Sequence, residues 1–492
     1  MNTDKQKILK NILIVLLYAA ITLIMILKHE VWTDEAQVWQ ICRHLSVGNL
    51  FKHLVNEGHP AFYYLILMPF AKMHMNIFAM KIICWLSMCT ASFLLLQFSP
   101  FNKFTKFSIM VSCPFLYTFP VIARSYSIIP VLLFTIAVLY PKRHQKQILY
   151  SILLAILANT HIIMFGFVFT LGALFLYESF KDKKYNFLSL FIIFSGLLAV
   201  ILQLKGSLSS NVAIALHPTN INQSLAVILT FFMYGYNESI HNFVVTISWF
   251  DYILLSLNII LFLAILIILF INKNKSMFLT AFIATIFQFL IYIFSYSFII
   301  YTTRIYVLYI ILLFTFWISL TEMSKVRQKL INIVLSLFFI LTIWNCYKNY
   351  LLDYFYNYSS AKETADFARN NFEKDAFIII QNTPNCVAII YYLDNLDLFA
   401  VNYNSYIKYI KWQHNINMII SQESWGLYLN YLKTMNNEIN IQNKNIYLIT
   451  PDAYTIKYEP VGFKLIFRSH NAIHSNETFN VYRYIRNKIT NN

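Results

Sequence analysis

Two adjacent carboxylates, Asp34 and Glu35, lie in a short polar stretch between long apolar runs, with Trp32 and Trp39 on either side. Tryptophans are enriched where a chain passes from lipid to water. A pair of carboxylates at that depth is costly unless it has a partner or a chemical task. A carboxylate within reach of a hydroxyl or amine can remove its proton as a general base. The pair therefore indicates acid–base chemistry at a membrane surface; the alternative is a wet loop whose acids are solvated.

Four further side chains from separate segments could act with this pair: His59, Arg124, His161 and Arg304. Arginine suits a phosphate group because its planar fork donates to two oxygens at once. The alternative for Arg124 is an ordinary arginine at the end of a span, whose long side chain reaches the lipid surface. The alternative for His161 is a hydrogen-bonded packing residue at the same boundary.

The chain of 492 residues is 58% hydrophobic and only 12% charged. Soluble chains average about 25% charged residues. This low fraction, with apolar runs of about 20 residues recurring along most of the length, predicts a polytopic α-helical membrane protein. The net charge of +16 fits Lys and Arg retained in short cytoplasmic loops, which argues against nucleic-acid binding. Six scattered cysteines without a CxxC pair predict neither a metal site nor a disulfide framework.

Loop charges predict the topology of these spans. Three lysines in the first ten residues place the N-terminus in the cytoplasm, so the first span, residues 11–27, leads outside. Residues 61–73 are apolar but too short to cross about 30 Å of hydrocarbon, and they predict an interfacial or re-entrant helix instead. Residues 28–76 then form one external loop. About eleven crossings follow from spans of about 20 residues, with the C-terminus outside and every candidate residue at the external end of a span.

From about residue 350 the sequence alternates between helix-like and strand-like patches. Ser360 to Glu363 has the pattern of a capping box that opens a helix to about Phe372, and a second helix is expected at Trp425–Met435. The expected strands are Ala376–Ile380, Val387–Leu393, Ile446–Ile449, Phe463–Phe467 and Phe479–Tyr484. The chain therefore divides into a transmembrane domain, residues 1–349, and an extracytoplasmic α/β domain, residues 350–492.

The stretch from Trp32 to Trp39 has the pattern W-x-D-E-A-Q-x-W, and the stretch from Gly58 to Tyr64 has the pattern G-H-P-x-x-Y-Y. A first membrane span followed by these two motifs resembles the GT-C membrane glycosyltransferases. The closest likeness is to the protein O-mannosyltransferases and the lipid A aminoarabinose transferases, and it covers roughly residues 8–350. The family usually has a second proline where this chain has Ala61.

The resemblance implies an enzyme that takes a sugar from a polyprenyl-phosphate carrier and transfers it, with inversion, to an extracytoplasmic acceptor. It implies Asp34 as the general base, since the first acid of the pair has this role in the family, and Glu35 as the residue that orients the acceptor or a cation. His59 matches the family's His-Pro and is expected to contact donor or acceptor. The Arg-x-Tyr pattern of the family matches Arg124-Ser125-Tyr126, which implies phosphate contact for Arg124 and Tyr126.

Some members of the family bind a divalent metal through acids of two external loops. No convincing second acidic site precedes residue 238, so no metal and no other cofactor is expected. The expected partners are the lipid-linked sugar donor, a glycan, lipid or protein acceptor and the lipid bilayer. Nine glycines and a bias toward Asn, Ile and Lys suit a low-GC bacterial genome, and hence the bacterial plasma membrane.

Three other functions are weighed at this stage. A membrane-anchored binding or scaffold protein would need only one or two spans, so about eleven would go unexplained. A polysaccharide polymerase or ligase also handles lipid-linked sugars from outside, but such enzymes depend on external Arg and His rather than on an acidic pair after the first span. A secondary transporter places its ionisable residues near the bilayer midplane, on broken helices in repeated halves. The sequence shows no internal repeat, and its candidate residues gather at one boundary.

Overall fold

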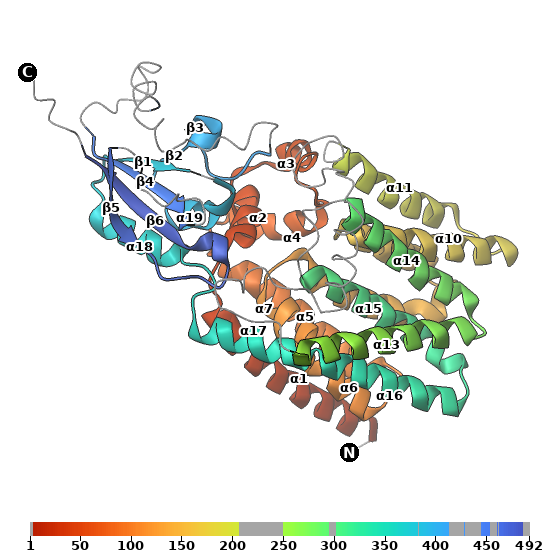
Figure 1. Cartoon of the computed structure of the whole chain (residues 1–492). Helices are drawn as coiled ribbons and strands as arrows, with labels where there is room; N and C mark the ends of the chain where they lie inside the picture. The colour runs from red at the N-terminus through yellow and green to blue at the C-terminus, as the bar shows by residue number, and fades with distance from the viewer. Residues whose placement is uncertain are drawn as a thin grey trace, which may run out of the picture.

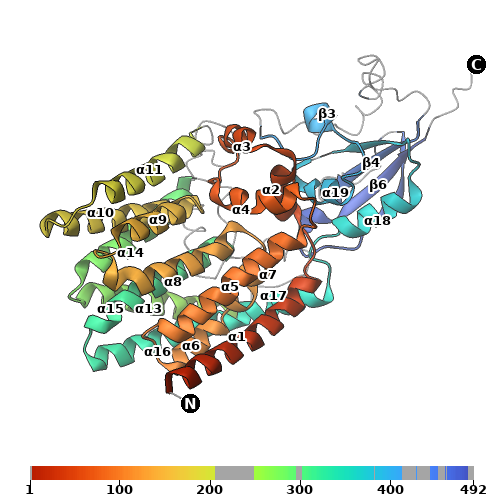
Figure 2. The ribbon, with the colours of Figure 1, turned by 180° about the vertical axis from the view of Figure 1, so that it is seen from behind.

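The computed structural model is a bundle of long helices with a β-sheet at one end (Figure 1). The N-terminus lies at the end of the bundle away from the sheet in both views (Figures 1 and 2). The structure describes residues 3–205, 249–294, 302–381, 383–412, 428, 444–452, 460 and 462–485. The predicted helix at Trp425–Met435 therefore lies, apart from Tyr428, outside the described residues.

Seven helical segments within these ranges are long and apolar enough to cross a membrane. They contain 18 to 31 residues each, close to or above the roughly 20 that a span requires. Helices span lipid because each one satisfies its own backbone N–H and C=O groups internally. The segments are built on α1 (Thr3–Lys28), α5 (Phe78–Phe98), α8 (Ile129–Leu139), α10 (Phe165–Lys181), α11 (Phe187–Leu204), α15 (Thr302–Ser319) and α16 (Lys325–Leu341) with α17 (Ile343–Phe355).

Three further apolar helices have a shorter described apolar part: α9 (Gln147–Ala158), α13 (Trp249–Ile271) and α14 (Lys275–Phe294). The apolar run before Ala123 is broken into α6 (Lys103–Met110), a π-helical turn (Pro114–Thr118) and α7 (Phe119–Val121). Pro114 and Pro120 contribute to this break, because proline lacks the N–H that a continuous helix needs. The count of about eleven crossings stays a prediction.

The stretch 28–76 folds into three short helices at the sheet end of the bundle (Figure 1). They are α2 (Thr33–His44), α3 (Val47–Leu54) and α4 (Phe62–Lys72). The eleven residues of α4 are too few to cross a bilayer, and the helix packs against α2. A short helix was the expectation for residues 61–73.

The sheet has six strands in the order β3-β2-β1-β4-β6-β5. β1 is parallel to β2 and β4, whereas the other neighbours are antiparallel. The strands are β1 (Phe377–Ile380), β2 (Leu398–Ala400), β3 (Ser405–Tyr406), β4 (Ile446–Pro451), β5 (Phe463–Arg468) and β6 (Phe479–Tyr484). Four expected strands are thus confirmed as β1, β4, β5 and β6, and β2 and β3 are additions.

The strand prediction for Val387–Leu393 is wrong, because these residues form the helix α19 (Val387–Tyr392). α19 lies in the connection between β1 and β2, which are parallel, and parallel neighbours need a crossover that is usually helical. Helix α18 (Ala361–Asn371) begins where expected, but without the reciprocal capping box. Ser360 Oγ instead donates to the carbonyl of His470, and Glu363 accepts from His470 N.

The sheet region packs onto the helices of the external stretch. A single hydrophobic core contains Trp39 of α2, Leu67 of α4, Ile380 of β1 and Val387 of α19. The helix α17 runs through residue 350 to Phe355 and leads into this region. The division of the chain into domains at residue 350 stays a prediction, but the shared core packs α2 between bundle and sheet.

Candidate active site

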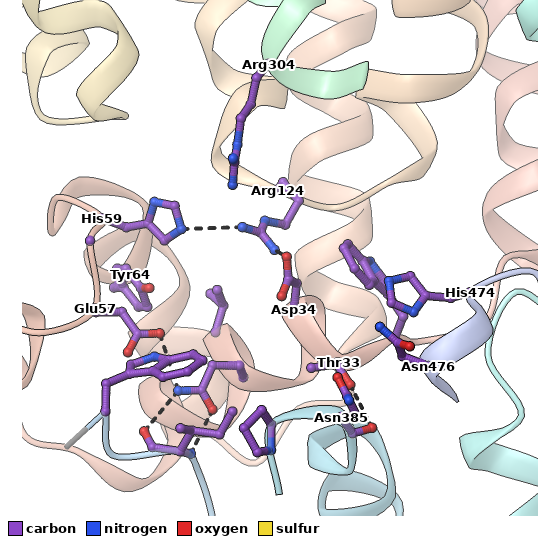
Figure 3. A pocket seen from close by; sticks show the side chains of 17 residues that line it. Thr33, Asp34, Glu57, His59, Tyr64, Arg124, Arg304, Asn385, His474 and Asn476 are labelled. Atoms are coloured by element: carbon purple, nitrogen blue, oxygen red, sulfur yellow. Dashed lines mark hydrogen bonds and ion pairs between the residues drawn. The ribbon is translucent and has the colours of Figure 1, made fainter. Parts of the chain in front are cut away.

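A cavity of about 270 Å³ opens beside the N-terminal part of α2, where the bundle meets the sheet region (Figure 3). Its walls come from α2, the loop before α4 and the first turn of α4, the turn before α8, the start of α15 and three segments of the C-terminal region. The lining residues are Trp32, Thr33, Asp34, Gln37, Val38, Glu57, Gly58, His59, Tyr64, Arg124, Arg304, Pro384, Asn385, Ile410, Trp412, His474 and Asn476.

Helical geometry decides which residues of α2 reach the cavity. Asp34, Gln37 and Val38 line it, and their spacing of three and four residues places them on one face of a helix. The next residue after Asp34 is rotated by about 100°, since an α-helix has about 3.6 residues per turn. Glu35 accordingly faces the core and lies outside the cavity lining.

Asp34 forms an ion pair with Arg124, whose guanidinium lies beside it (Figure 3). The Arg124 side chain is 10% exposed and that of Asp34 is 38% exposed, so the carboxylate can be reached from the cavity. Burial by itself lowers the pKa of Arg124, but Asp34 raises it to a net value above the usual range. The Arg124 guanidinium also lies over the ring of Trp32, 5.8 Å from its centroid.

Glu35 holds the turn that carries Arg124. Its Oε1 accepts a hydrogen bond from the backbone N of Ala123 at 2.7 Å and lies 3.6 Å from His29 Nε2. Its Oε2 lies 3.9 Å from Lys81 Nζ. Burial raises the pKa of Glu35, but Lys81 and His29 more than offset this and leave it lowered. Glu35 therefore contacts the turn that carries Arg124 and does not line the cavity. The catalytic role expected for Glu35 stays a prediction.

His59 reaches the cavity from a tight turn. Gly58 has a φ of 78°, a left-handed conformation that glycine adopts without steric cost. The turn is tied to the bundle because Ala61 N donates to Gln203 Oε1 at 2.7 Å. His59 Nε2 lies 3.4 Å from Arg124 Nη2. Burial, with Arg124 and Arg304 adding to it, lowers the pKa of His59 to about 3, which leaves the imidazole neutral.

Arg304, Tyr126 and His161 form a connected group around Arg124 and His59. Arg304 lines the cavity, and its Nε donates to the hydroxyl of Tyr126 at 3.1 Å. The His161 ring packs against Tyr126 and His59, with centroids 4.5 and 5.1 Å apart. His161 Nδ1 accepts from the backbone N of Ile163. Tyr126 and His161 are buried outside the cavity lining, so they support the lining residues rather than contact a ligand there.

Sequence reasoning missed the contribution of the C-terminal region, which supplies Pro384, Asn385, Ile410, Trp412, His474 and Asn476 to the lining. These positions form no recognisable motif. Because asparagine is common throughout the chain, nothing in the sequence distinguishes Asn385 and Asn476 from the other asparagines. It also missed Gln37, which pairs with the backbone of Ile410: Ile410 N donates to its Oε1 at 2.9 Å, and its Nε2 donates to Ile410 O at 3.1 Å. The three-residue spacing from Asp34 to Gln37 was the available signal.

Within the described ranges, no group of three or more His, Cys, Asp or Glu side chains is placed to hold a metal ion. The two acids that line the cavity are both engaged: Asp34 pairs with Arg124, and Glu57 accepts from Gln37 and lies 3.0 Å from His53 Nε2. The expectation that the chain needs no metal stays a prediction.

Comparisons with known proteins identify the fold. No protein-family model and no curated protein sequence matches the chain. Among solved structures the chain is similar to the crystal structure of ArnT from Cupriavidus metallidurans bound to undecaprenyl phosphate. The TM-score is 0.51 at 10% sequence identity, and the match covers 96% of this chain and 98% of the other. At this identity the likeness shows the fold, and it confirms the expected GT-C-like polytopic membrane architecture with a C-terminal sheet region.

Proposed function

We propose that the chain is a membrane glycosyltransferase that transfers a sugar from a polyprenyl-phosphate donor to an extracytoplasmic acceptor. The observation that carries the proposal is the pairing of Asp34 with Arg124 at a cavity that Arg304 and His59 also line. A carboxylate beside two guanidinium groups suits a reaction in which an acceptor loses a proton while a phosphate leaves. The fold likeness to ArnT, a protein crystallised with undecaprenyl phosphate, supports the same class of donor.

The proposed reaction balances with these groups. The acceptor gives its proton to the Asp34 carboxylate, its oxygen or nitrogen bonds to the anomeric carbon, and the bond from that carbon to the phosphate oxygen breaks. Arg124 and Arg304 bind the departing phosphate, which gains negative charge in the transition state. Fixed cations in a partly dry site stabilise that charge without reorganising. Attack from the side opposite the phosphate inverts the anomeric centre.

The Asp34–Arg124 pair also suggests an order of events. In the structure the Arg124 guanidinium is paired with the Asp34 carboxylate. A phosphate that takes the guanidinium in a bidentate contact competes with Asp34 and frees it to receive a proton from the acceptor. Neutral His59, beside Arg124, then provides a hydrogen-bonding group that adds no charge of its own.

The location follows from the same arrangement. The cavity is lined by α2 and by the C-terminal region. Both lie at the end of the bundle away from the N-terminus (Figures 1 and 2). The three lysines of the first ten residues favour a cytoplasmic N-terminus. The proposal therefore places the cavity and the sheet region outside a bacterial plasma membrane, where a lipid-linked donor can enter from the outer leaflet.

The test is turnover of a lipid-phosphate donor by the purified chain. The protein is incubated with synthetic short-chain polyprenyl-phosphate hexoses and pentoses and an envelope extract as acceptor, and release of the free polyprenyl phosphate is measured. Replacement of Asp34 by Asn keeps the shape and removes the base, so turnover should fall by about 10²–10⁴. Replacement of the exposed Asp366 by Asn is the matched control and should leave turnover unchanged. Absence of release from every donor would overturn the proposal.

A further inference from the structure

The two sides of the cavity differ in charge. Arg124 and Arg304 approach Asp34 from the bundle side, whereas His474, Asn476 and Asn385 lie on the opposite side of it (Figure 3). The cationic side is the one to which the proposed function assigns the donor phosphate. The opposite side belongs to the C-terminal region, and it is where an acceptor can approach the Asp34 carboxylate.

The C-terminal side carries carboxamides and an aromatic ring. Asn385 and Asn476 each offer both hydrogen-bond donors and an acceptor, a combination that matches hydroxyl groups. Trp412 adds a flat apolar surface to the same lining. His474 is neutral near pH 7, because burial lowers its pKa to about 4. Within the described part of the chain, this side contributes no lysine or arginine to the cavity.

A buried acid in the loop before α4 makes the cavity unfavourable for anions. Glu57 lines the cavity and is only 7% exposed. Gln37 Nε2 donates to its Oε1 at 3.3 Å and joins it to the backbone of Ile410 at 3.1 Å. An anionic group on the acceptor would meet this carboxylate in a confined space, and like charges so placed repel.

Several buried polar atoms of lining residues have no hydrogen-bond partner in the described structure. They include Trp32 Nε1 and Tyr64 Oη, on side chains that are 6% and 1% exposed, besides the Nδ1 atoms of His59 and His474. Buried donors of this kind are normally satisfied, because leaving them unpaired is unfavourable. Trp32 Nε1 and Tyr64 Oη are uncharged groups that can donate to a ligand oxygen. Together with the carboxamides they make a built site for a ligand rich in uncharged oxygens.

We propose that the acceptor is an uncharged saccharide that binds between α2 and the side formed by Asn385, Trp412 and Asn476, and presents a hydroxyl to Asp34. This inference rests on the proposed function and names its acceptor class. The carboxamides pair with sugar hydroxyls, and the apolar face of a pyranose ring packs on the indole of Trp412. A saccharide that carries phosphate or carboxylate groups is disfavoured, because the Glu57 carboxylate lines the same cavity.

The experiment uses the full chain in lipid nanodiscs and a glycan microarray. The array carries neutral gluco-, manno- and galacto-oligosaccharides beside the same chains bearing phosphate or uronic acid. We expect binding to one or more neutral glycans and at least about tenfold weaker binding to their charged counterparts. Equal or stronger binding to the charged glycans, or no binding to any neutral one, overturns the inference. This comparison needs only the unmodified chain, so it stands even where a variant fails to fold.

Two variants then locate the glycan. Asn476→Ala and Trp412→Ala should each weaken neutral-glycan binding by about tenfold, because each removes one of the proposed contacts. Asn371→Ala, which alters an exposed asparagine at the end of α18, is the matched control and should bind like the parent. Unchanged glycan binding by both cavity variants would overturn the proposed location and with it the inference.

Separate binding of undecaprenyl phosphate distinguishes the two proposals. Arg124→Ala should weaken lipid binding, whereas Asn476→Ala should retain it and thereby show an intact site. A chain that binds neutral glycans but not undecaprenyl phosphate contradicts the proposed function and leaves the glycan site in place. Competition by a soluble diglucoside, or only by vesicles containing diglucosyl diacylglycerol, shows whether the saccharide is a free glycan or a lipid headgroup; either result supports the inference.

Discussion

Replacing Glu35 tests whether this acid positions the site or takes part in the chemistry. The side chain is fully buried, and its carboxylate meets three groups: Ala123 N at 2.7 Å, His29 Nε2 at 3.6 Å and Lys81 Nζ at 3.9 Å. Burial alone lowers the pKa of His29, but Asp353, 2.8 Å from its Nδ1, raises it to about 9. Glu35 therefore balances a cationic pair in a buried place.

The size of the effect follows from these contacts. Glu35→Ala leaves a buried charge without its partner, which typically costs about 3–5 kcal/mol of unfolding free energy. It also leaves the backbone N–H of Ala123 unpaired, at a further cost of about 1–3 kcal/mol. Glu35→Gln keeps an oxygen for Ala123, and His29 can lose its proton to relieve the remaining charge. Stability should therefore fall in the order parent, Gln variant, Ala variant.

The assay combines thermal unfolding in detergent with turnover per folded molecule. We expect a clear loss of unfolding temperature for both variants. Turnover of the folded Gln variant should stay within about tenfold of the parent, because the hydrogen bond that fixes the Arg124 turn is retained. An unchanged unfolding temperature with turnover as low as that of Asp34→Asn would refute the reasoning. Glu35 would then be a catalytic residue, and its side chain would have to reach the cavity during the reaction.

Arg124→Ala should lower turnover strongly with a smaller effect on donor affinity, since the leaving phosphate gains charge in the transition state; Arg124→Lys should rescue only part of this, because an ammonium lacks the two-pronged geometry. Equal turnover for Arg, Lys and Ala in the lipid-phosphate assay would remove Arg124 from the site. A cysteine at Asn56 should react with an impermeant thiol reagent on intact cells, and a reporter fused to the C-terminus should be external, as the loop charges predict; a cytoplasmic signal from either contradicts that topology. Burial raises the pKa of Glu477 from its ordinary value of about 4.5 to about 7. The stability that this proton contributes is complete below about 4.5 and is lost as the pH rises through about 7. Glu477→Gln should reduce the dependence of the unfolding temperature on pH between about 4.5 and 7. If the unfolding temperatures of the parent and the Gln variant differ by the same amount at every pH, this reasoning is wrong.

The apolar runs predicted the helical bundle well because lipid imposes a strict demand. A span must be apolar over roughly 20 residues and must satisfy its own backbone hydrogen bonds, so length and composition suffice to find it. Hydrophobicity does not fix the local structure of every apolar run, since the run before Ala123 is broken at Pro114 and Pro120. The strand prediction failed at Val387–Tyr392, where a short buried apolar run fits a strand or a helix equally well and the parallel β1–β2 connection selects the helix.

The candidate site was partly predictable for a similar reason. Loop charges placed His59, Arg124 and Arg304 at one end of the bundle, and the structure brings all three to one cavity. The same reasoning could not separate residues that contact a ligand from residues one layer behind. Tyr126 and His161 sit at the same end, yet they pack behind Arg304 and His59.

The sequence by itself determined the membrane class, the sites of most spans and the polar stretch from which the site is built. Only the tertiary structure decided which of two adjacent acids faces the cavity. Asp34 and Glu35 are adjacent carboxylates, and their positions in the sequence do not distinguish them. In α2, successive side chains are rotated by about 100°. Asp34 therefore contacts Arg124, whereas Glu35 contacts Ala123, His29 and Lys81. Only the structure joined α2 to Asn385 and Asn476, more than 340 residues away along the chain. Such contacts leave no local pattern, because they depend on how the sheet region packs onto α2 rather than on the residues beside them.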